Sequence, residues 1–232
     1  MKAILLAGGR GTRISRYIGD CPKCILDIGG IPLIRHTVLL MLKNKIKVSV
    51  VLGYNKEQVK EALEGLDVTY YYNPFYDVTN SIASLWFAKE ELSEDDIIIA
   101  NADVFMEQDI LDVVINNEQD NMMLMDSSRD SDYLFKCQNN LLMAHGKELQ
   151  GKISGEYVGL AKLNKGFVKT FNSRLIEMIG NQNHNLWWEN VLYSFIGERN
   201  VNVNDIKGSF WSEIDFIEDY NRIVDYRKGL KK

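Results

Sequence analysis

KAILLAGGRGTR, residues 2–13, joins a compact apolar run to a glycine-rich turn. The apolar run, residues 2–7, is typical of a buried parallel strand. Glycines let backbone N–H groups approach phosphate oxygens closely, and a turn rich in N–H groups makes an anion site. Arg13 adds a forked cation suited to phosphate. The segment predicts a phosphate site after the first strand; a tight strand-to-helix turn with a solvated arginine is the alternative.

Helical and strand-like segments alternate beyond this turn. Strand patterns cover residues 47–53, 68–72 and 96–100, and helical patterns cover 31–44, 56–64 and 80–92. The second half is less regular, with strands expected at 121–126, 133–137, 156–163 and 201–206, and helices at 165–179, 184–196 and 216–228. This order predicts an α/β fold, a Rossmann-like, doubly wound, mostly parallel mixed sheet in a single domain over residues 1–232. Ligands are expected at the carboxyl ends of the parallel strands.

Composition narrows the class of partner. The formal net charge of −5 argues against a nucleic-acid partner, because phosphate backbones demand a basic face. The sequence has no run of about 18 apolar residues, so no membrane span is predicted. The first apolar run is too short for an export signal. Three cysteines (Cys21, Cys24 and Cys137) without such a signal predict a reduced, cytoplasmic protein.

Three familiar motifs fail on their details. A dinucleotide fingerprint needs G-x-G-x-x-G, but Ile14 stands where its third glycine belongs. That failure weakens an NAD-dependent oxidoreductase as a reading. A P-loop needs Gly-Lys-Ser/Thr after four intervening residues, and this is absent. The pair Cys21 and Cys24 has no second cysteine pair to complete a zinc site.

Lys23 follows Arg13 by ten residues, in Pro22-Lys23. L-A-G-G-x-G-T-R followed by P-K resembles the nucleotidyltransferase family that makes nucleoside-diphosphate sugars and CDP-alcohols. The resemblance implies that Arg13 and Lys23 are catalytic, neutralising phosphate charge. It implies a nucleotide-binding loop of Leu6, Ala7, Gly8, Gly9, Gly11, Thr12, Arg13 and Lys23. Ile14 and Arg16 depart from the usual leucine and proline of the family.

Two acidic segments suggest a metal site. Asp103 follows the strand at 96–100, and a carboxylate at a strand end is well placed to hold Mg²⁺ against phosphates. Glu213 and Asp215 lie two apart, so on an extended strand both face one side. Helix capping is the alternative for each segment. The resemblance implies that Asp103 binds the catalytic metal, Mg²⁺, and that Asp215, with Glu213, completes the site.

The resemblance also implies the reaction. A phosphate or phosphonate oxygen of the acceptor attacks the α-phosphorus of the nucleoside triphosphate in line, and pyrophosphate leaves. Because the attacking group is already an anion, no general base is needed. Catalysis then consists of positioning and charge neutralisation.

A resemblance to one branch of the family implies the nucleotide and the residues that contact it. The loop, residues 77–92, Ala102-Asp103 and residues 213–220 resemble the bacterial CTP-dependent branch, the LicC-type phosphocholine cytidylyltransferases and their phosphonate-using relatives. CTP is therefore favoured over UTP or dTTP. Residues expected near the base or ribose are Asn80, Ser81, Ser84 and Ala102; helix capping is the alternative role for the first three.

Aromatic and acidic residues in the second half suggest the acceptor site. Aromatic faces and carboxylates attract ammonium groups. Such a wall suits phosphocholine, phosphoethanolamine or 2-aminoethylphosphonate, although core packing is the alternative for most of these aromatics. The expected acceptor residues are Tyr157, Glu156, Trp188 and Glu189, beside Trp86 and Trp187, with Lys162 at the acceptor's phosphate.

Two other functions stay open. A sugar-1-phosphate nucleotidylyltransferase using UTP or dTTP shares the loop and the metal site and differs in its acceptor pocket. A non-catalytic nucleotide-binding subunit predicts loss of a phosphate cation or a metal carboxylate, yet Arg13, Lys23, Asp103 and Asp215 are all present. The aromatics near 186–195 fit either a homodimer interface or the pocket.

Overall fold

The first apolar run forms β1 (Lys2–Ala7), the middle of a mixed sheet, in a computed structural model that describes residues 1–230. β1 pairs in parallel with β2 (Lys47–Leu52) on one side and β4 (Ile97–Asn101) on the other. β3 (Val68–Tyr72) extends the sheet beyond β2, also in parallel. The loops after β1 and β4 therefore leave the same edge of the sheet, side by side.

The rest of the sheet comes from the second half of the chain. β9 (Gly155–Leu163) lies antiparallel between β4 and β6 (Asn121–Asp126), and β10 (Val203–Asp205) runs parallel to β6. In the described residues the order is β10-β6-β9-β4-β1-β2-β3, in which β9 alone runs against its neighbours. The predicted fold class is therefore confirmed. A hairpin of β7 (Leu134–Gln138) and β8 (Leu141–Gly146) pairs with β9 beside the sheet.

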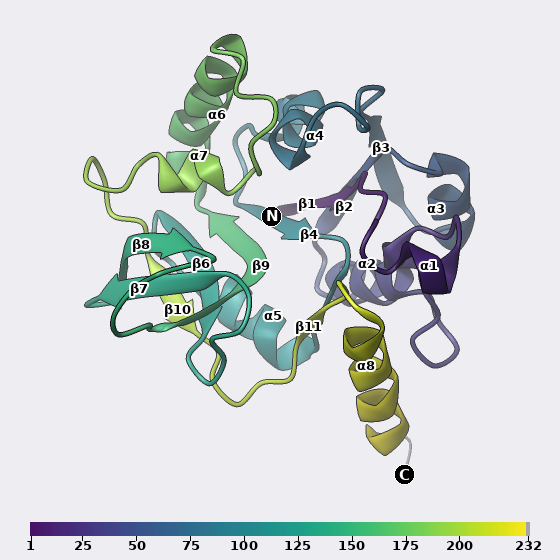
Figure 1. Cartoon of the computed structure of the whole chain (residues 1–232). Helices are drawn as coiled ribbons and strands as arrows, with labels where there is room; N and C mark the ends of the chain where they lie inside the picture. The colour runs from purple at the N-terminus through teal and green to yellow at the C-terminus, as the bar shows by residue number, and fades with distance from the viewer. Residues whose placement is uncertain (231–232) are drawn as a thin grey trace.

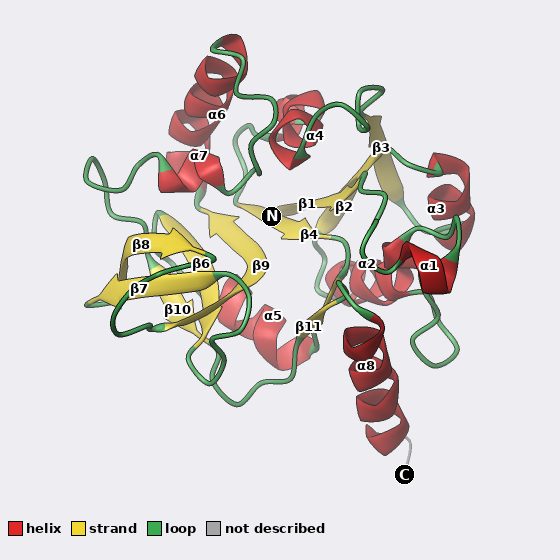
Figure 2. Ribbon diagram, viewed as in Figure 1, coloured by secondary structure: helices red, strands yellow, loops and turns green. Residues whose placement is uncertain are grey.

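Helices cover both faces of the sheet (Figures 1 and 2). One face carries α4 (Ser81–Phe87), α6 (Lys165–Gly180) and α7 (Asn190–Tyr193). The other carries α2 (Leu33–Lys43), α3 (Lys56–Ala62) and α5 (Gln108–Ile115). Alternate residues of β1 fill the two cores, Ile4 on the first face and Leu5 on the second, as the two-residue period of a strand requires.

A third, smaller core joins the two ends of the described chain. Short elements here are α1 (Ser15–Ile18), the 3₁₀ turn η1 (Lys23–Ile25), β5 (Val104–Phe105) and β11 (Ser212–Glu213). Ile14, Phe105 and Ile214 are fully buried together against the final helix α8 (Ile217–Leu230). β11 pairs antiparallel with β5, and the Ile214 N–H donates to the Asp103 carbonyl at 3.0 Å. This pairing brings the acidic segment at 213–215 to the end of β4.

Two expected helices are shorter than predicted. The helix expected at 80–92 ends at Phe87, with a 3₁₀ turn η2 (Lys89–Glu91) beyond it. The helix expected at 184–196 is reduced to α7, because carbonyls of His184 and Leu186 accept from N–H groups at the start of α4. Tertiary hydrogen bonds therefore replace the helical ones in this segment.

The sequence patterns missed β8 and α5. None of the helices within residues 1–230 combines the length and the apolar character needed to cross a membrane.

Candidate active site

Two adjoining cavities open at the carboxyl ends of β1 and β4. The smaller, about 280 Å³, lies between the loop after β1 and the start of α4. The larger, about 380 Å³, is bounded by β9, α7 and the segments before β7 and after β8. Both are lined by Lys23, Asn80, Ser81, Asn101, Trp187 and Glu213. A ligand can therefore extend from one cavity into the other.

The glycine-rich loop lines the smaller cavity with Gly8 and Gly9. Gly11 has φ +63°, a left-handed conformation that favours glycine. A Cβ there would lie 2.4 Å from Lys23 Cγ, so the loop and the lysine pack directly together. Within residues 1–230, no protein atom accepts from the N–H groups of Gly9, Arg10 or Gly11. These donors suit an anion.

Two cations and two carboxylates meet beside this loop. Lys23 Nζ lies 2.7 Å from Asp103 Oδ2 and 2.9 Å from Asp215 Oδ1. Arg13 pairs with the second oxygen of Asp215. Burial opposes ionisation of Lys23, but the charges of Asp103 and Asp215 outweigh it and hold its pKa above the usual range. Burial also opposes ionisation of Asp215, yet Lys23 keeps its pKa below the ordinary value.

The two glutamates of the larger cavity behave in the opposite way. Burial raises the pKa of Glu189 to about 7, although its side chain accepts a hydrogen bond from Asn101 Nδ2 at 3.4 Å. Burial, followed by the charge of Asp103, raises the pKa of Glu213 well above its usual range. Burial therefore favours the neutral form of both carboxyls in the empty cavity, and a cation bound beside them would favour the charged form.

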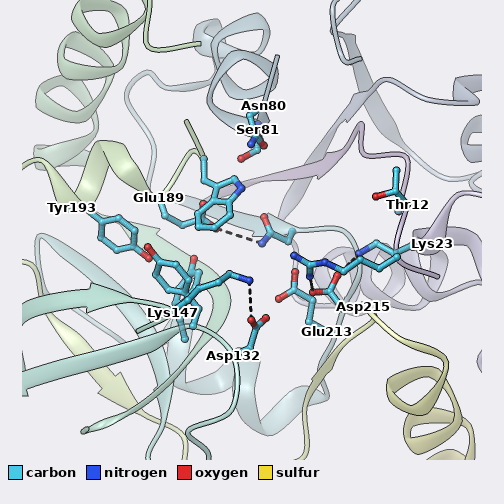
Figure 3. Close-up of a pocket in the computed structure, with 16 residues that line it drawn as sticks. Thr12, Lys23, Asn80, Ser81, Asp132, Lys147, Glu189, Tyr193, Glu213 and Asp215 are labelled. Carbon is cyan, nitrogen blue, oxygen red and sulfur yellow. Dashed lines mark hydrogen bonds and ion pairs between the residues drawn. The ribbon is translucent and has the colours of Figure 1, made fainter. Parts of the chain in front are cut away.

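Aromatic rings form the far wall of the larger cavity. Tyr133, Tyr157, Trp187 and Tyr193 line it. Lys147 follows β8 and pairs with Asp132 at 3.0 Å on the same side. Figure 3 shows Tyr193, Glu189 and Lys147 across the cavity from Lys23 and Asp215.

Most of the residues predicted from sequence gather here. Those that line one or both cavities are Leu6, Gly8, Gly9, Gly11, Thr12, Arg13, Lys23, Asn80, Ser81, Ser84, Asp103, Glu213, Asp215, Tyr157 and Glu189. The predicted cap is present as well, because Asn80 Oδ1 accepts from the Ser81 N–H at 2.7 Å.

Five predicted residues lie elsewhere. Glu156 accepts from Ser131 Oγ at 2.9 Å, and it points away from the cavity because its neighbour Tyr157 points in. Lys162 is buried and donates to the Ile115 carbonyl at 3.1 Å. The others are buried in the cores: Ala7, Ala102 and Trp188. Trp188 contacts the site indirectly, because its Nε1 donates to Asn101 Oδ1 at 3.0 Å and Asn101 lines both cavities.

Sequence reasoning missed part of the wall: Asn101, Asp132, Tyr133, Lys147 and Tyr193. Asn101 carried a weak signal, since it ends the strand that precedes Asp103. Lys147 carried none, because it follows a strand that the pattern did not indicate.

The carboxylates beside Lys23 fit a metal ion that is bound together with a ligand. Within residues 1–230, no three His, Cys, Asp or Glu side chains are gathered closely enough to hold an ion alone. Mg²⁺ commonly takes only one or two carboxylates and completes its shell with phosphates and water. Asp103 and Asp215 already share one cation, Lys23, so their oxygens converge on a common point. The residues present therefore fit Mg²⁺ bound together with a triphosphate.

A doubly wound sheet, a glycine-rich anion loop and paired carboxylates at the strand ends define a nucleotidyltransferase. A family model described as the MobA-like NTP transferase domain matches residues 3–162, and the chain belongs to that family.

Individual relatives cover nearly the whole chain. The choline-phosphate cytidylyltransferase of Streptococcus pneumoniae is 26% identical, over 99% of this chain and 99% of its own. The CTP:phosphoglutamine cytidylyltransferase of Campylobacter jejuni is 27% identical, over 94% of this chain and 97% of its own. The solved structure of CTP:phosphocholine cytidylyltransferase from Streptococcus pneumoniae shares the fold, with a TM-score of 0.78 and 20% identity over 97% of this chain and 98% of that one.

Proposed function

We propose that this chain is a Mg²⁺-dependent cytidylyltransferase that transfers CMP from CTP to a small phosphorylated or phosphonate amino-alcohol. The observation that carries the proposal is the junction of the two cavities at Lys23 and Glu213. The glycine-rich loop lies on one side of the paired carboxylates and the aromatic, acidic wall on the other, and this arrangement supports the proposal. The names of the two relatives support CTP and a small phosphorylated acceptor.

The smaller cavity is assigned to the nucleotide. The N–H groups of Gly9, Arg10 and Gly11 face the triphosphate oxygens, with the charges of Arg13 and Lys23 beside them. Asp103 and Asp215 are the groups that would hold Mg²⁺, which would supply positive charge beside the triphosphate. Glu213 is assigned to the acceptor side instead, because it shares no cation with the two aspartates in ion pairs of the described chain.

The nucleoside is assigned to the start of α4. The amide nitrogen of Asn80 donates no hydrogen bond within residues 1–230, so it is available to a base or ribose oxygen. The hydroxyls of Ser81 and Ser84 have structural partners: Ser81 Oγ accepts from the Trp188 N–H at 2.9 Å, and Ser84 Oγ accepts from Asn73 Nδ2 at 3.1 Å. These two serines position α4, and Asn80 is the group proposed to meet the nucleoside.

The reaction joins the two cavities. An oxygen of the acceptor's phosphate or phosphonate forms a new bond to the α-phosphorus of CTP. The bond from that phosphorus to the bridging oxygen breaks, and its electron pair leaves with pyrophosphate. No proton moves, so the residues act by holding the two reactants in line and by balancing charge. Lys147, across from Lys23, supplies a cation for the acceptor's anionic end.

Pyrophosphate release tests the proposal. CTP, UTP, dTTP, ATP and GTP are each paired with phosphocholine, phosphoethanolamine, 2-aminoethylphosphonate and glucose-1-phosphate, with Mg²⁺ and with EDTA. Turnover with CTP and an amino-alcohol acceptor, lost in EDTA, is the expected result. Turnover confined to UTP or dTTP with glucose-1-phosphate would show a sugar-1-phosphate nucleotidylyltransferase. Binding of CTP without turnover on the whole grid would favour a non-catalytic subunit.

A further inference from the structure

The larger cavity contains a buried hydroxyl whose hydrogen bonding is incomplete. Tyr157 Oη is shielded from solvent and lies beside the Glu189 carboxylate, but it makes no well-aligned hydrogen bond within the described residues. Tyr157 lines the cavity from β9, and its ring stacks on Phe135 at 5.2 Å. Burial, and then the nearby charge of Glu189, raises the pKa of this phenol. A buried hydroxyl normally has a partner, so a ligand is the natural group to supply one.

Glu189 lies beside this hydroxyl and is also incompletely satisfied. Glu189 is 6% exposed, and its carboxylate interacts with Asn101 Nδ2 at 3.4 Å and with the neighbouring Tyr157 hydroxyl. No lysine or arginine within residues 1–230 pairs with it. A buried carboxylate without a cation is costly unless a bound group compensates it. Glu189 and Tyr157 together therefore present hydrogen-bond acceptors to whatever occupies this end.

The aromatic rings of the wall largely face one another. Tyr193 stacks on His145 with ring centroids 3.7 Å apart. Tyr133 stacks on Tyr193 and meets the edge of Trp187. The hydroxyl of Tyr133 is paired with His145 Nδ1 at 2.9 Å. Recognition of a quaternary ammonium relies on several open ring faces arranged as a cage. In this wall Tyr133, Tyr193 and His145 stack on one another, which leaves Trp187, 39% exposed, as the ring with an accessible surface. One accessible ring does not make a cage.

We propose that the acceptor's head group is a primary ammonium, recognised by hydrogen bonds to Glu189 and Tyr157, and not a quaternary ammonium. This inference rests on the function proposed above and narrows its substrate class to aminoalkyl phosphates and phosphonates. A primary ammonium donates three hydrogen bonds, and it supplies both the cation that Glu189 lacks and the donor that Tyr157 Oη lacks. A trimethylammonium group supplies the charge but no N–H donor, so it forms no hydrogen bond with either residue.

Phosphoethanolamine and phosphocholine test the inference as a matched pair, because they differ only in three N-methyl groups. With CTP and Mg²⁺, we expect kcat/KM for phosphoethanolamine to exceed that for phosphocholine by roughly 10- to 100-fold, as for sites that leave buried polar groups unpaired with the wrong substrate. Equal values, or a preference for phosphocholine, would overturn the inference and leave the proposed function standing. Turnover with glucose-1-phosphate alone, or a lack of turnover with every acceptor, would refute both the inference and the proposed function.

Tyr157→Phe shows whether the hydroxyl carries the preference. The variant removes one hydroxyl and keeps the ring that stacks on Phe135, so we expect the fold to be retained. We expect the preference for phosphoethanolamine to shrink by about tenfold through loss on phosphoethanolamine, with phosphocholine nearly unchanged. Tyr133→Phe is the matched control, because that hydroxyl is already paired with His145; it should change both acceptors by one common factor.

A binding measurement separates recognition from turnover. Isothermal titration of CDP-ethanolamine and CDP-choline into the wild-type protein should give tighter binding of CDP-ethanolamine. Tyr157→Phe should reduce that difference by about the factor seen in kcat/KM. An unchanged preference in Tyr157→Phe, by either measurement, would show that the hydroxyl does not select the head group and would overturn the assignment.

Discussion

Replacement of Glu189 by glutamine should stabilise the unliganded protein while weakening its acceptor site. Burial holds the pKa of Glu189 at about 7, against an ordinary value of 4.5. At about 1.4 kcal/mol per pH unit, this gap corresponds to roughly 3 kcal/mol of cost for the charged form in the empty cavity. Glutamine has nearly the same shape, stays neutral and can still accept from Asn101.

The sign follows from proton binding. Between pH 4.5 and about 7 the folded state holds the Glu189 proton more tightly than the unfolded chain does. Stability that the wild type has below pH 4.5 is therefore lost as the pH rises to about 7. Glu189→Gln avoids this loss. Its advantage in unfolding free energy should be below about 1 kcal/mol at pH 5 and about 2–3 kcal/mol at pH 8.

Urea denaturation at pH 5 and pH 8, without nucleotide or divalent ions, measures this difference. In a thermal melt at pH 8, 2–3 kcal/mol is an increase in Tm of roughly 4–10 °C for a chain of this size. The control is Glu57→Gln, because that side chain is 73% exposed; its effect should stay within about 0.5 kcal/mol at both pH values. A Glu189→Gln variant with no more advantage at pH 8 than at pH 5 would refute the reasoning.

Three further substitutions test the rest of the site. Asp103→Ala should lower kcat by at least about 100-fold in pyrophosphate release, with an unchanged circular dichroism spectrum, because the carboxylate serves charge balance at a strand end rather than the core. Gly11→Ala should lower kcat/KM for CTP by at least about tenfold, since its Cβ would lie 2.4 Å from Lys23 Cγ. Lys162→Met should lower the unfolding free energy by about 1–3 kcal/mol in urea and leave kcat unchanged, because Lys162 binds backbone carbonyls away from both cavities.

Each of the three substitutions has a control variant or a result that would contradict its prediction. Gly19→Ala matches Gly11→Ala, because Gly19 also has a positive φ (+61°) but no atom within 4 Å of the added Cβ; it should keep its activity. Near-normal turnover of Asp103→Ala with Mg²⁺ would remove that residue from the proposed metal site. A rise in KM for the acceptor in Lys162→Met, with unchanged stability, would return Lys162 to the acceptor site.

The sequence pattern predicted structure well where a residue type has a single structural role, as apolar runs have in buried strands. The apolar run before Gly8 predicted β1, and residues 121–126 and 68–72 form β6 and β3 with the predicted bounds. The spacing of the glycines, Arg13 and Lys23 predicted the phosphate loop, and the structure brings these residues together at the cavities. Glu213 and Asp215 both reached the cavity, as two residues on one side of an extended segment should.

Long-range contacts explain what local pattern missed. Nothing near Lys147 or Asp132 in the sequence indicates that the segments flanking the β7–β8 hairpin line the larger cavity. The segment at 184–189 looks helical by itself, and only α4 shows why it is not. Glu156 and Tyr157 were both expected to reach the acceptor, yet adjacent residues of β9 point to opposite sides. The two-residue period of a strand therefore allows only one of these two neighbours to reach the cavity, and that residue is Tyr157.

The position of the acidic segment late in the chain determines when parts of the site form during translation. Asp215 meets Arg13 across 202 positions of the chain. A polypeptide growing from its amino end makes the phosphate loop and the central strands long before this segment leaves the ribosome. Until then, Lys23 and Arg13 lack the Asp215 carboxylate that joins them. The nascent chain therefore acquires the glycine-rich loop early and completes the proposed site late, when β11 pairs with β5.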